Sequence, residues 1–185
     1  MLDAIDLMVL DIDGVLADGR IVYDSRGGET KSFHVTDGQG LRYWMRVGHE
    51  AAILSGRSSA PIRYRAEELG IRCVHMGAKD KLPVFEKILK RFRRTADRVC
   101  YVGDDLVDIP VMARCGFAVA TPDAAAEVRR VAHYVTRRPG GAGAVREVIE
   151  LILNYQGRWP EITTRYRDQL PAGLPPRRNP WREVL

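Results

Sequence analysis

The stretch Leu7-Met8-Val9-Leu10-Asp11-Ile12-Asp13-Gly14 determines how the rest of the chain is interpreted. Four apolar residues end at two carboxylates spaced i, i+2, and a glycine follows at once. A short apolar run is typical of a buried parallel strand, and alternation places Asp11 and Asp13 on the same side where it ends. Two neighbouring acids repel each other unless a cation or a shared proton relieves the charge. Because Mg²⁺ prefers oxygen ligands, the pair predicts a metal site with a carboxylate left for chemistry.

The motif Asp-x-Asp-Gly has other interpretations. A calcium loop of the EF-hand type is excluded, because Val15 and Leu16 stand where further oxygen ligands should follow. An ordinary turn remains open for this stretch taken alone, so the decision depends on the rest of the chain.

Composition limits the class of protein. A length of 185 residues predicts one domain with a substantial core. The net charge of +5 is modest and the basic residues are scattered before the C-terminal segment, which favours an anionic small molecule over nucleic acid as partner. The odd number of cysteines (Cys73, Cys100 and Cys115) predicts buried free thiols of a reducing compartment. With no membrane-span or signal-peptide pattern, we expect a cytoplasmic protein.

Strand and helix patterns alternate along most of the chain. They predict an α/β fold, a three-layer α/β/α sandwich with a doubly wound parallel sheet. The Gly27-Gly28 turn between two extended segments predicts a projecting β-hairpin at about residues 20–35, which should pack on something, for example another subunit. We expect the domain to cover residues 1–156. Residues 157–185, rich in Pro and Arg, should form an irregular tail that is either docked through Trp159 and Trp181 or disordered.

Polar residues that phosphate chemistry could use follow four of the expected strands. Asp11 and Asp13 follow the first, and Ser55-Gly56-Arg57 follows the second. Lys81 opens the helix after the third, and Asp104-Asp105 follows the fourth, with Asp108 one helical turn on. Because the carboxyl ends of parallel strands share one edge of a sheet, we expect these residues to converge.

Such a set could hydrolyse a phosphate monoester. One carboxylate can be the nucleophile, passing through an aspartyl phosphate, and a second can protonate the leaving oxygen and then activate water. Mg²⁺ held by Asp11 and Asp104 would offset the repulsion between acid and phosphate. The Ser55 hydroxyl and the Lys81 ammonium would hold phosphoryl oxygens. Taken singly, Ser55 could be a helix cap, Lys81 part of an exposed charge run, and Gly103-Asp104-Asp105 a turn.

With these residues in this order, the sequence resembles the haloacid dehalogenase superfamily. Its four motifs match Asp11-x-Asp13, Ser55, Lys81 and Gly103-Asp104-Asp105-x-x-Asp108. Over roughly residues 5–155 the chain is similar to the capless subfamily of 3-deoxy-D-manno-octulosonate 8-phosphate phosphatases. The segments that carry this likeness are Asp11–Gly19, the hairpin, Phe33–Arg42, Tyr101–Asp108 and Gly140–Glu147.

The resemblance implies a Mg²⁺-dependent phosphatase without a cap domain, which serves lipopolysaccharide precursor synthesis. It implies Asp11 as nucleophile, Asp13 as general acid/base, and Mg²⁺ on the Asp11 carboxylate, the Asp13 carbonyl and Asp104. Asp105 and Asp108 would orient Lys81 or metal-bound water. The implied substrate contacts are Asp13, His34, Val35, Thr36, Asp37, Gly38, Arg42, Arg57, Arg65 and Lys81.

The resemblance also implies a homotetramer whose hairpins meet centrally and whose hairpin or tail closes a neighbour's site. Three arginines suit a substrate that carries a carboxylate besides its phosphate. The chain departs from the family in having Ser55 for Thr, Ala17 for Thr and Met76 for Gln. Arg57 favours the eight-carbon substrate, because relatives acting on nine-carbon esters tend to carry Glu there.

Three alternatives stay open. The first is a phosphatase of a nine-carbon sugar acid phosphate, either the 9-phosphate of KDN (a nine-carbon deaminated relative of neuraminate) or that of an N-acylneuraminate. The second is a non-catalytic oligomerisation module, although the chain keeps Asp13 and Lys81. The third and weakest is a nucleic-acid binder acting through Arg177-Arg178 and their neighbours.

Overall fold

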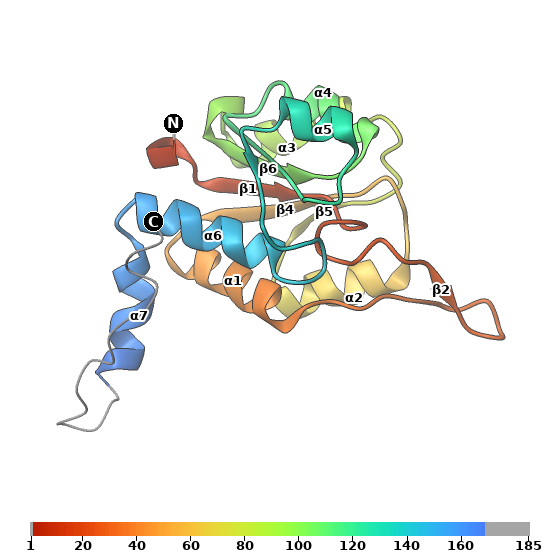
Figure 1. Cartoon of the computed structure of the whole chain (residues 1–185), viewed down its shortest axis with the longest axis horizontal. Coiled ribbons are helices and arrows are strands. Elements are labelled where there is room, and N and C mark those ends of the chain that lie inside the picture. Colours follow the sequence, from red (N-terminus) through yellow and green to blue (C-terminus); the bar gives the residue numbers. More distant parts are fainter. Residues whose placement is uncertain (1, 169–185) are drawn as a thin grey trace.

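A six-stranded parallel sheet forms the centre of the molecule (Figure 1). The computed structural model describes residues 2–168. The strand order is β5-β4-β1-β6-β7-β8, so the apolar run of the first motif lies in the middle, paired with β4 and β6. The strands are β1 (Leu7–Leu10), β4 (Glu50–Leu54), β5 (Cys73–His75), β6 (Val99–Gly103), β7 (Phe117–Ala120) and β8 (Tyr134–Val135).

Helices cover both faces of this sheet, as Figure 1 shows. One face carries α1 (Val35–Arg46), α2 (Ala60–Leu69) and α6 (Ala144–Tyr155), and the other carries α3 (Lys81–Phe92), α4 (Ile109–Met112) and α5 (Ala126–Val131). The 3-10 turns are η1 (Leu2–Ala4), η2 (Ala96–Arg98) and η3 (Leu106–Asp108). Strand β1 serves both cores, because Met8 and Leu10 pack on one side and Leu7 and Val9 on the other. The predicted three-layer fold is confirmed, and residues 2–168 contain no separate cap domain.

Local sequence explains where the helices begin and end. Pro61 lies in the first turn of α2, where its missing N–H costs nothing, and Gly70 ends the helix with a left-handed φ of 77°. Helix α3 begins after Asp80, whose side chain accepts a hydrogen bond from Leu82 N. Such caps fix the loops at the sheet edges, and therefore the side chains that these loops carry.

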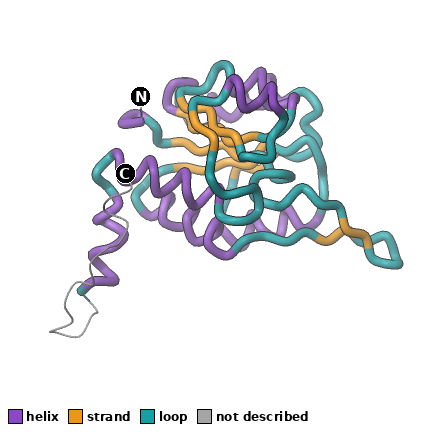
Figure 2. Tube along the Cα trace, viewed as in Figure 1, coloured by secondary structure: helices purple, strands orange, loops and turns teal. Residues whose placement is uncertain are grey.

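The predicted hairpin is present and extends from the body of the molecule (Figure 2). Strands β2 (Val22–Tyr23) and β3 (Glu29–Thr30) pair antiparallel. The turn is closed by Asp24, whose Oδ1 accepts hydrogen bonds from the backbone N–H groups of Arg26 and Gly28. A two-stranded ribbon of this size is marginal alone, so its attachment to the body matters.

The segment after Gly157 differs from the irregular tail that the sequence predicted. Residues Trp159–Arg167 form helix α7 rather than irregular chain, because Pro160 falls in the first helical turn, where proline is tolerated. Ile162 is buried in the core, and the Trp159 ring meets Tyr43 edge-on with centroids 5.9 Å apart. The predicted docking through Trp159 is therefore seen, whereas Trp181 lies outside the described residues.

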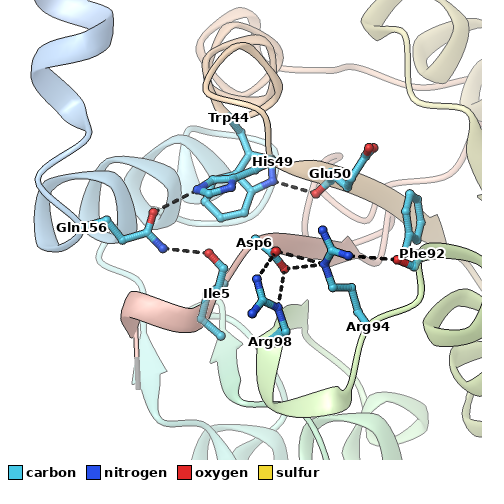
Figure 3. A network of polar contacts seen from close by, with 9 residues as sticks. All are labelled: Ile5, Asp6, Trp44, His49, Glu50, Phe92, Arg94, Arg98 and Gln156. Carbon is cyan, nitrogen blue, oxygen red and sulfur yellow. Dashed lines mark hydrogen bonds and ion pairs between the residues drawn. The ribbon is translucent and has the colours of Figure 1, made fainter.

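A network of polar contacts lies at the amino-terminal edge of the sheet (Figure 3). Asp6 precedes β1, and both its oxygens accept from Arg94 Nε at 3.0 Å, while Arg98 binds the same carboxylate. Burial alone would raise the pKa of Asp6, but donation from the two arginines lowers it below the ordinary value. The charge at this edge is thus compensated within the chain.

Hydrogen bonds at the same edge of the sheet hold the C-terminal end of α6 in place. Gln156 Oε1 accepts a hydrogen bond from His49 Nε2 at 3.0 Å, and Gln156 Nε2 donates to the Ile5 carbonyl at 2.7 Å (Figure 3). Trp44 Nε1 donates to the Glu50 carbonyl.

Two further predictions from the sequence concern the cysteines and membrane spans. The three cysteines are free and buried, as predicted. Between residues 2 and 168, no helix has the length and apolar character needed to cross a bilayer.

Candidate active site

The carboxyl-terminal edge of the sheet brings the predicted residues together. Asp11 and Asp13 follow β1, Ser55 follows β4, Asp104 follows β6, and Lys81 begins α3. They surround a hollow of about 230 Å³. Its lining is Asp11, Asp13, Gly19, Ser55, Gly56, Arg57, Lys81, Asp104, Asp105 and Val107. The convergence expected from the strand ends is therefore observed.

Lys81 is buried and bridges two carboxylates. Its Nζ lies 2.9 Å from Asp11 Oδ2 and donates a hydrogen bond to Asp108 Oδ1 at 2.6 Å. Burial alone would lower the pKa of Lys81, but the charges of Asp11 and Asp108 raise it above its ordinary value. Lys81 is therefore a fixed cation beside Asp11, and the interpretation of it as part of an exposed charge run is wrong.

Asp108 has all its acceptor capacity engaged by donors of the protein. Its Oδ1 accepts from Lys81 and from the Tyr101 hydroxyl at 2.6 Å, and its Oδ2 accepts from the backbone N–H groups of Asp104 and Asp105. The role expected for Asp108, orienting Lys81, fits these contacts. Asp105 instead accepts from Leu106 N and begins η3.

Asp11 and Asp104 have more negative charge around them than the chain neutralises. Burial raises the pKa of Asp11 to about 6, although Lys81 opposes the shift. Burial, together with Asp11 and Asp108, raises the pKa of Asp104 to about 8. The Asp104 Oδ1 atom is buried without a hydrogen-bond partner. Oxygens of Asp11, Asp104 and Asp108 lie within 4.8 Å of one another. An unpartnered oxygen in an all-carboxylate set fits a hard divalent cation such as Mg²⁺.

A late loop supports the turn that carries Asp13. Gly14 has φ 78°, and a Cβ there would lie 2.0 Å from Asp104 Oδ2, so only glycine fits. Gly141 N donates to the Val15 carbonyl at 2.8 Å. A Cβ on Gly140 would lie 1.9 Å from the Gly14 carbonyl oxygen. Gly140 and Gly141 therefore pack directly against the first loop of the site.

Ser55 is buried at the edge of the hollow. Its Oγ accepts a hydrogen bond from Arg57 N at 3.2 Å, so the hydroxyl shapes the loop after β4. The interpretation of Ser55 as a helix cap is wrong, because the N-cap residue of α2 is Ser59. Ser55 lines the hollow beside Asp11 and Lys81, and its contact with a phosphoryl group stays a prediction.

Two residues that the sequence analysis did not single out lie beside Asp13. Lys31 Nζ donates to Asp13 Oδ1 and lies 2.9 Å from Glu29 Oε1. Arg57 completes the group, with Nη2 3.2 Å from Glu29 Oε2 and Nε 3.6 Å from Asp13 Oδ2. The i, i+2 spacing of Glu29 and Lys31, which places both on one face of an extended strand, was the available signal.

The remaining predicted substrate contacts gather elsewhere. Val35, Gly38, Arg42 and Arg65 line a second hollow of about 110 Å³ between α1 and α2. In this group Arg65 Nη2 donates to the His34 carbonyl, and His34 Nδ1 caps the first turn of α1 by accepting from Thr36 N. Of the predicted arginines, Arg57 alone lines the hollow that holds Asp11. The second group stays a prediction for substrate contact.

Asp37 has a structural task in this chain. It is fully buried, with Oδ2 accepting from Gly143 N at 3.1 Å and Oδ1 from Arg146 N at 2.8 Å. These bonds tie the start of α1 to the start of α6 and thereby hold the loop that supports Gly14. The carboxylate as placed has no free face toward a ligand.

Comparison with known proteins agrees with this geometry. Residues 76–149 match the family model described as haloacid dehalogenase-like hydrolase. The chain is 43% identical over 154 residues to 3-deoxy-D-manno-octulosonate 8-phosphate phosphatase KdsC of Yersinia pestis, covering 83% of this chain and 82% of that protein. It is also 43% identical to the Escherichia coli K12 protein of the same name over 157 residues, covering 85% and 84%.

Solved structures extend the likeness to the whole fold. The Moraxella catarrhalis phosphatase of this name, in complex with magnesium, phosphate and KDO, superposes with a TM-score of 0.87 at 40% identity, covering 89% of this chain and 95% of that one. The cobalt-bound Haemophilus influenzae phosphatase gives 0.84 at 38%, covering 89% and 96%. The fold and the site thus define a haloacid dehalogenase-like hydrolase. Within that class, the chain belongs to the 3-deoxy-D-manno-octulosonate 8-phosphate phosphatase family.

Proposed function

We propose that this chain is a Mg²⁺-dependent phosphatase that hydrolyses 3-deoxy-D-manno-octulosonate 8-phosphate to 3-deoxy-D-manno-octulosonate (KDO) and phosphate. The observation that carries the proposal is the environment of Asp11. Its carboxylate is almost buried at the end of the central strand, is paired with Lys81, and stands beside the unpartnered Asp104 Oδ1. An activated carboxylate with fixed positive charge at its side is what phosphoryl transfer to an aspartate requires.

In the first half-reaction, an Asp11 oxygen forms a bond to phosphorus and the bond from phosphorus to the sugar oxygen breaks. Asp13 donates its proton to that leaving oxygen, which departs as the alcohol. Lys81 and the backbone around Ser55-Gly56 would contact the phosphoryl oxygens and stabilise their charge. The product on the protein is an aspartyl phosphate at Asp11.

In the second half-reaction, Asp13 takes a proton from water while the water oxygen bonds to phosphorus. The bond between phosphorus and Asp11 breaks, which releases phosphate and restores the Asp11 carboxylate and the Asp13 acid. The carboxylates of Asp11 and Asp104, with the Asp13 carbonyl, would hold Mg²⁺, which supplies positive charge to offset the repulsion between acids and phosphate. Asp108 would fix the position of Lys81 through its 2.6 Å hydrogen bond.

Arg57 supports a sugar acid phosphate as the substrate. Its guanidinium is 39% exposed at the mouth of the hollow, between Asp13 and Glu29, where it could bind the carboxylate of a sugar acid. A nine-carbon sugar acid phosphate is the alternative that the experiment must separate.

We also propose that the chain acts as a cytoplasmic homotetramer in lipopolysaccharide precursor synthesis. The hairpin supports this assembly, because Ile21, Val22 and Tyr23 are 48%, 52% and 61% exposed although they are apolar or aromatic. The group around Arg42 and Arg65 could then serve a neighbour's site. Light scattering on the protein, with Tyr23→Asp as the comparison, tests the assembly: a wild-type monomer would contradict it.

The experiment that tests the activity is phosphate release from a panel of esters with Mg²⁺. The panel holds the eight-carbon and nine-carbon sugar acid phosphates, ordinary sugar phosphates and an aryl phosphate, with EDTA and Asp11→Asn as controls. We expect the highest kcat/KM for the eight-carbon ester, lost in both controls. A preference for the nine-carbon ester would replace the substrate. Unchanged feeble activity in Asp11→Asn would favour the non-catalytic oligomerisation module.

A further inference from the structure

We propose that Lys31, on the projecting hairpin, is a positioning residue that holds the Asp13 carboxylate for proton transfer. The inference rests on the proposed function, in which Asp13 moves the proton. Part of the hairpin would then act in the reaction of its own subunit, in addition to any role in assembly.

The contacts form a closed ring of four charged side chains: Asp13, Lys31, Glu29 and Arg57. Each Asp13 oxygen faces one cation, since Oδ1 accepts from Lys31 and Oδ2 lies 3.6 Å from Arg57 Nε. Each Glu29 oxygen faces one cation too, since Oε1 lies 2.9 Å from Lys31 and Oε2 3.2 Å from Arg57. Two carboxyl groups and two cationic side chains therefore alternate around one ring.

Burial shows that this ring is built into the site. The Lys31 side chain has no exposed area, although it lies at the base of an exposed hairpin, and the Glu29 side chain is 13% exposed. A covered ammonium group requires partners that pair with its charge, and Asp13 and Glu29 are those partners. Arg57 is more exposed and its contact to Asp13 is longer. Lys31 is therefore the tighter of the two contacts that hold Asp13.

The position of a catalytic carboxylate decides how well it transfers protons. Asp13 must bring one oxygen within hydrogen-bond reach of the leaving oxygen, and later of the attacking water. Without Lys31, Asp13 Oδ1 loses its donor and the side chain keeps only the longer contact to Arg57. Lys31 touches Asp13 and Glu29 rather than any reacting atom, so it acts through Asp13.

The test compares two esters that differ in their need for an acid. The alkyl ester is the eight-carbon sugar acid phosphate, whose strongly basic leaving oxygen must be protonated. The aryl ester is 4-nitrophenyl phosphate, whose leaving group, 4-nitrophenolate, departs without a proton. The constant kcat/KM reports events up to the first irreversible step, here phosphoryl transfer. We expect Lys31→Met to lower kcat/KM for the alkyl ester by about 10- to 100-fold. The aryl ester should change by less than about threefold, and Lys31→Arg should recover most of the loss.

Control variants separate positioning from folding. Arg26→Met removes a charge at the exposed tip of the same hairpin and should leave both esters unchanged. Glu29→Gln keeps the shape of the ring while weakening the hold on Lys31, and should give a smaller loss with the same preference for the alkyl ester. It serves as the test if Lys31→Met fails to fold.

The outcomes are distinct. Equal loss on both esters, or no loss on either, in folded Lys31→Met or Glu29→Gln would overturn the positioning role while leaving the phosphatase activity intact. A wild-type protein that hydrolyses neither ester would overturn the proposed function, and the role of Lys31 with it.

Discussion

The two edges of the sheet carry carboxylates in opposite electrostatic states. At the amino-terminal edge, Asp6 is bound by Arg94 and Arg98, and its pKa is lowered (Figure 3). At the carboxyl-terminal edge, Asp11 and Asp104 share a single buried lysine with Asp108, and their pKa values are raised to about 6 and about 8. The first edge is compensated by the chain and stabilises it, whereas the second needs a cation from outside. The same residue type serves structure or chemistry according to its neighbours.

The largest expected effect follows from removing one carboxylate at each edge. Asp11→Asn should lower kcat by about 10⁴-fold or more, because the proposed nucleophile is lost. Asp6→Asn should leave kcat within about twofold, because it lies at the far edge of the sheet. Phosphate release at saturating Mg²⁺ measures both variants. A comparable loss in both would contradict the division between the edges.

The next effect concerns the cation. Asp104→Asn should raise the Mg²⁺ concentration for half-maximal activity by about 100-fold or more, because it removes the negative charge of a carboxylate whose Oδ1 has no partner within the described residues. Titration of activity with Mg²⁺ after EDTA treatment measures this shift. Asp105→Asn is the matched control, since Asp105 is more exposed and caps η3. An equal shift in the control would count against Asp104 as a ligand.

Stability should respond in opposite directions at the two edges. Asp6→Asn should lower the free energy of unfolding by about 1–3 kcal/mol, because Arg94 and Arg98 lose a charged acceptor. Asp104→Asn, measured in EDTA at alkaline pH, should not destabilise the protein, because it removes a carboxylate repelled by Asp11 and Asp108. Urea unfolding followed by circular dichroism measures both. Destabilisation by Asp104→Asn under these conditions would show that its charge is compensated after all.

The last prediction concerns the dependence of the free energy of unfolding on pH in EDTA. The raised pKa values of Asp11 and Asp104 mean that the folded chain keeps protons that the unfolded chain has lost above about 3.8, so stability falls as pH rises through about 6 and about 8. The lowered pKa of Asp6 acts in the other sense, and its contribution is lost in acid below 3.8. The midpoint temperature of thermal unfolding, Tm, measured in EDTA, should therefore fall toward alkaline pH. Mg²⁺ should reverse that decline, and its failure to do so would contradict this account.

The sequence predicted the parts of the site that depend on topology. Asp11, Lys81 and Asp104 lie at strand or helix ends, and a parallel sheet brings such ends to one edge whatever the details of packing. Lys31 and Glu29 could not be assigned in this way, because a hairpin has no fixed direction relative to the sheet from which it projects.

Two other features have different causes. Asp37 was expected to touch substrate through family resemblance, which stays a prediction, whereas its hydrogen bonds from Gly143 and Arg146, more than a hundred residues later, were not expected. No local pattern reveals such a partner. Helix α7 was missed because the prolines of the last segment were all taken as helix breakers, although Pro160 lies where a helix accepts one.

The approach of Gly140 and Gly141 to the Gly14 turn has a consequence for biosynthesis. Strand β1 leaves the ribosome more than a hundred residues before Gly140 and Gly141, whose backbone supports the turn that follows it. Its strand neighbour β6 is also late in the sequence. A nascent chain that ends before residue 140 would therefore carry Asp11 and Asp13 in an unfinished turn. Reactivity toward phosphate esters should thus appear only when synthesis of the domain is almost complete.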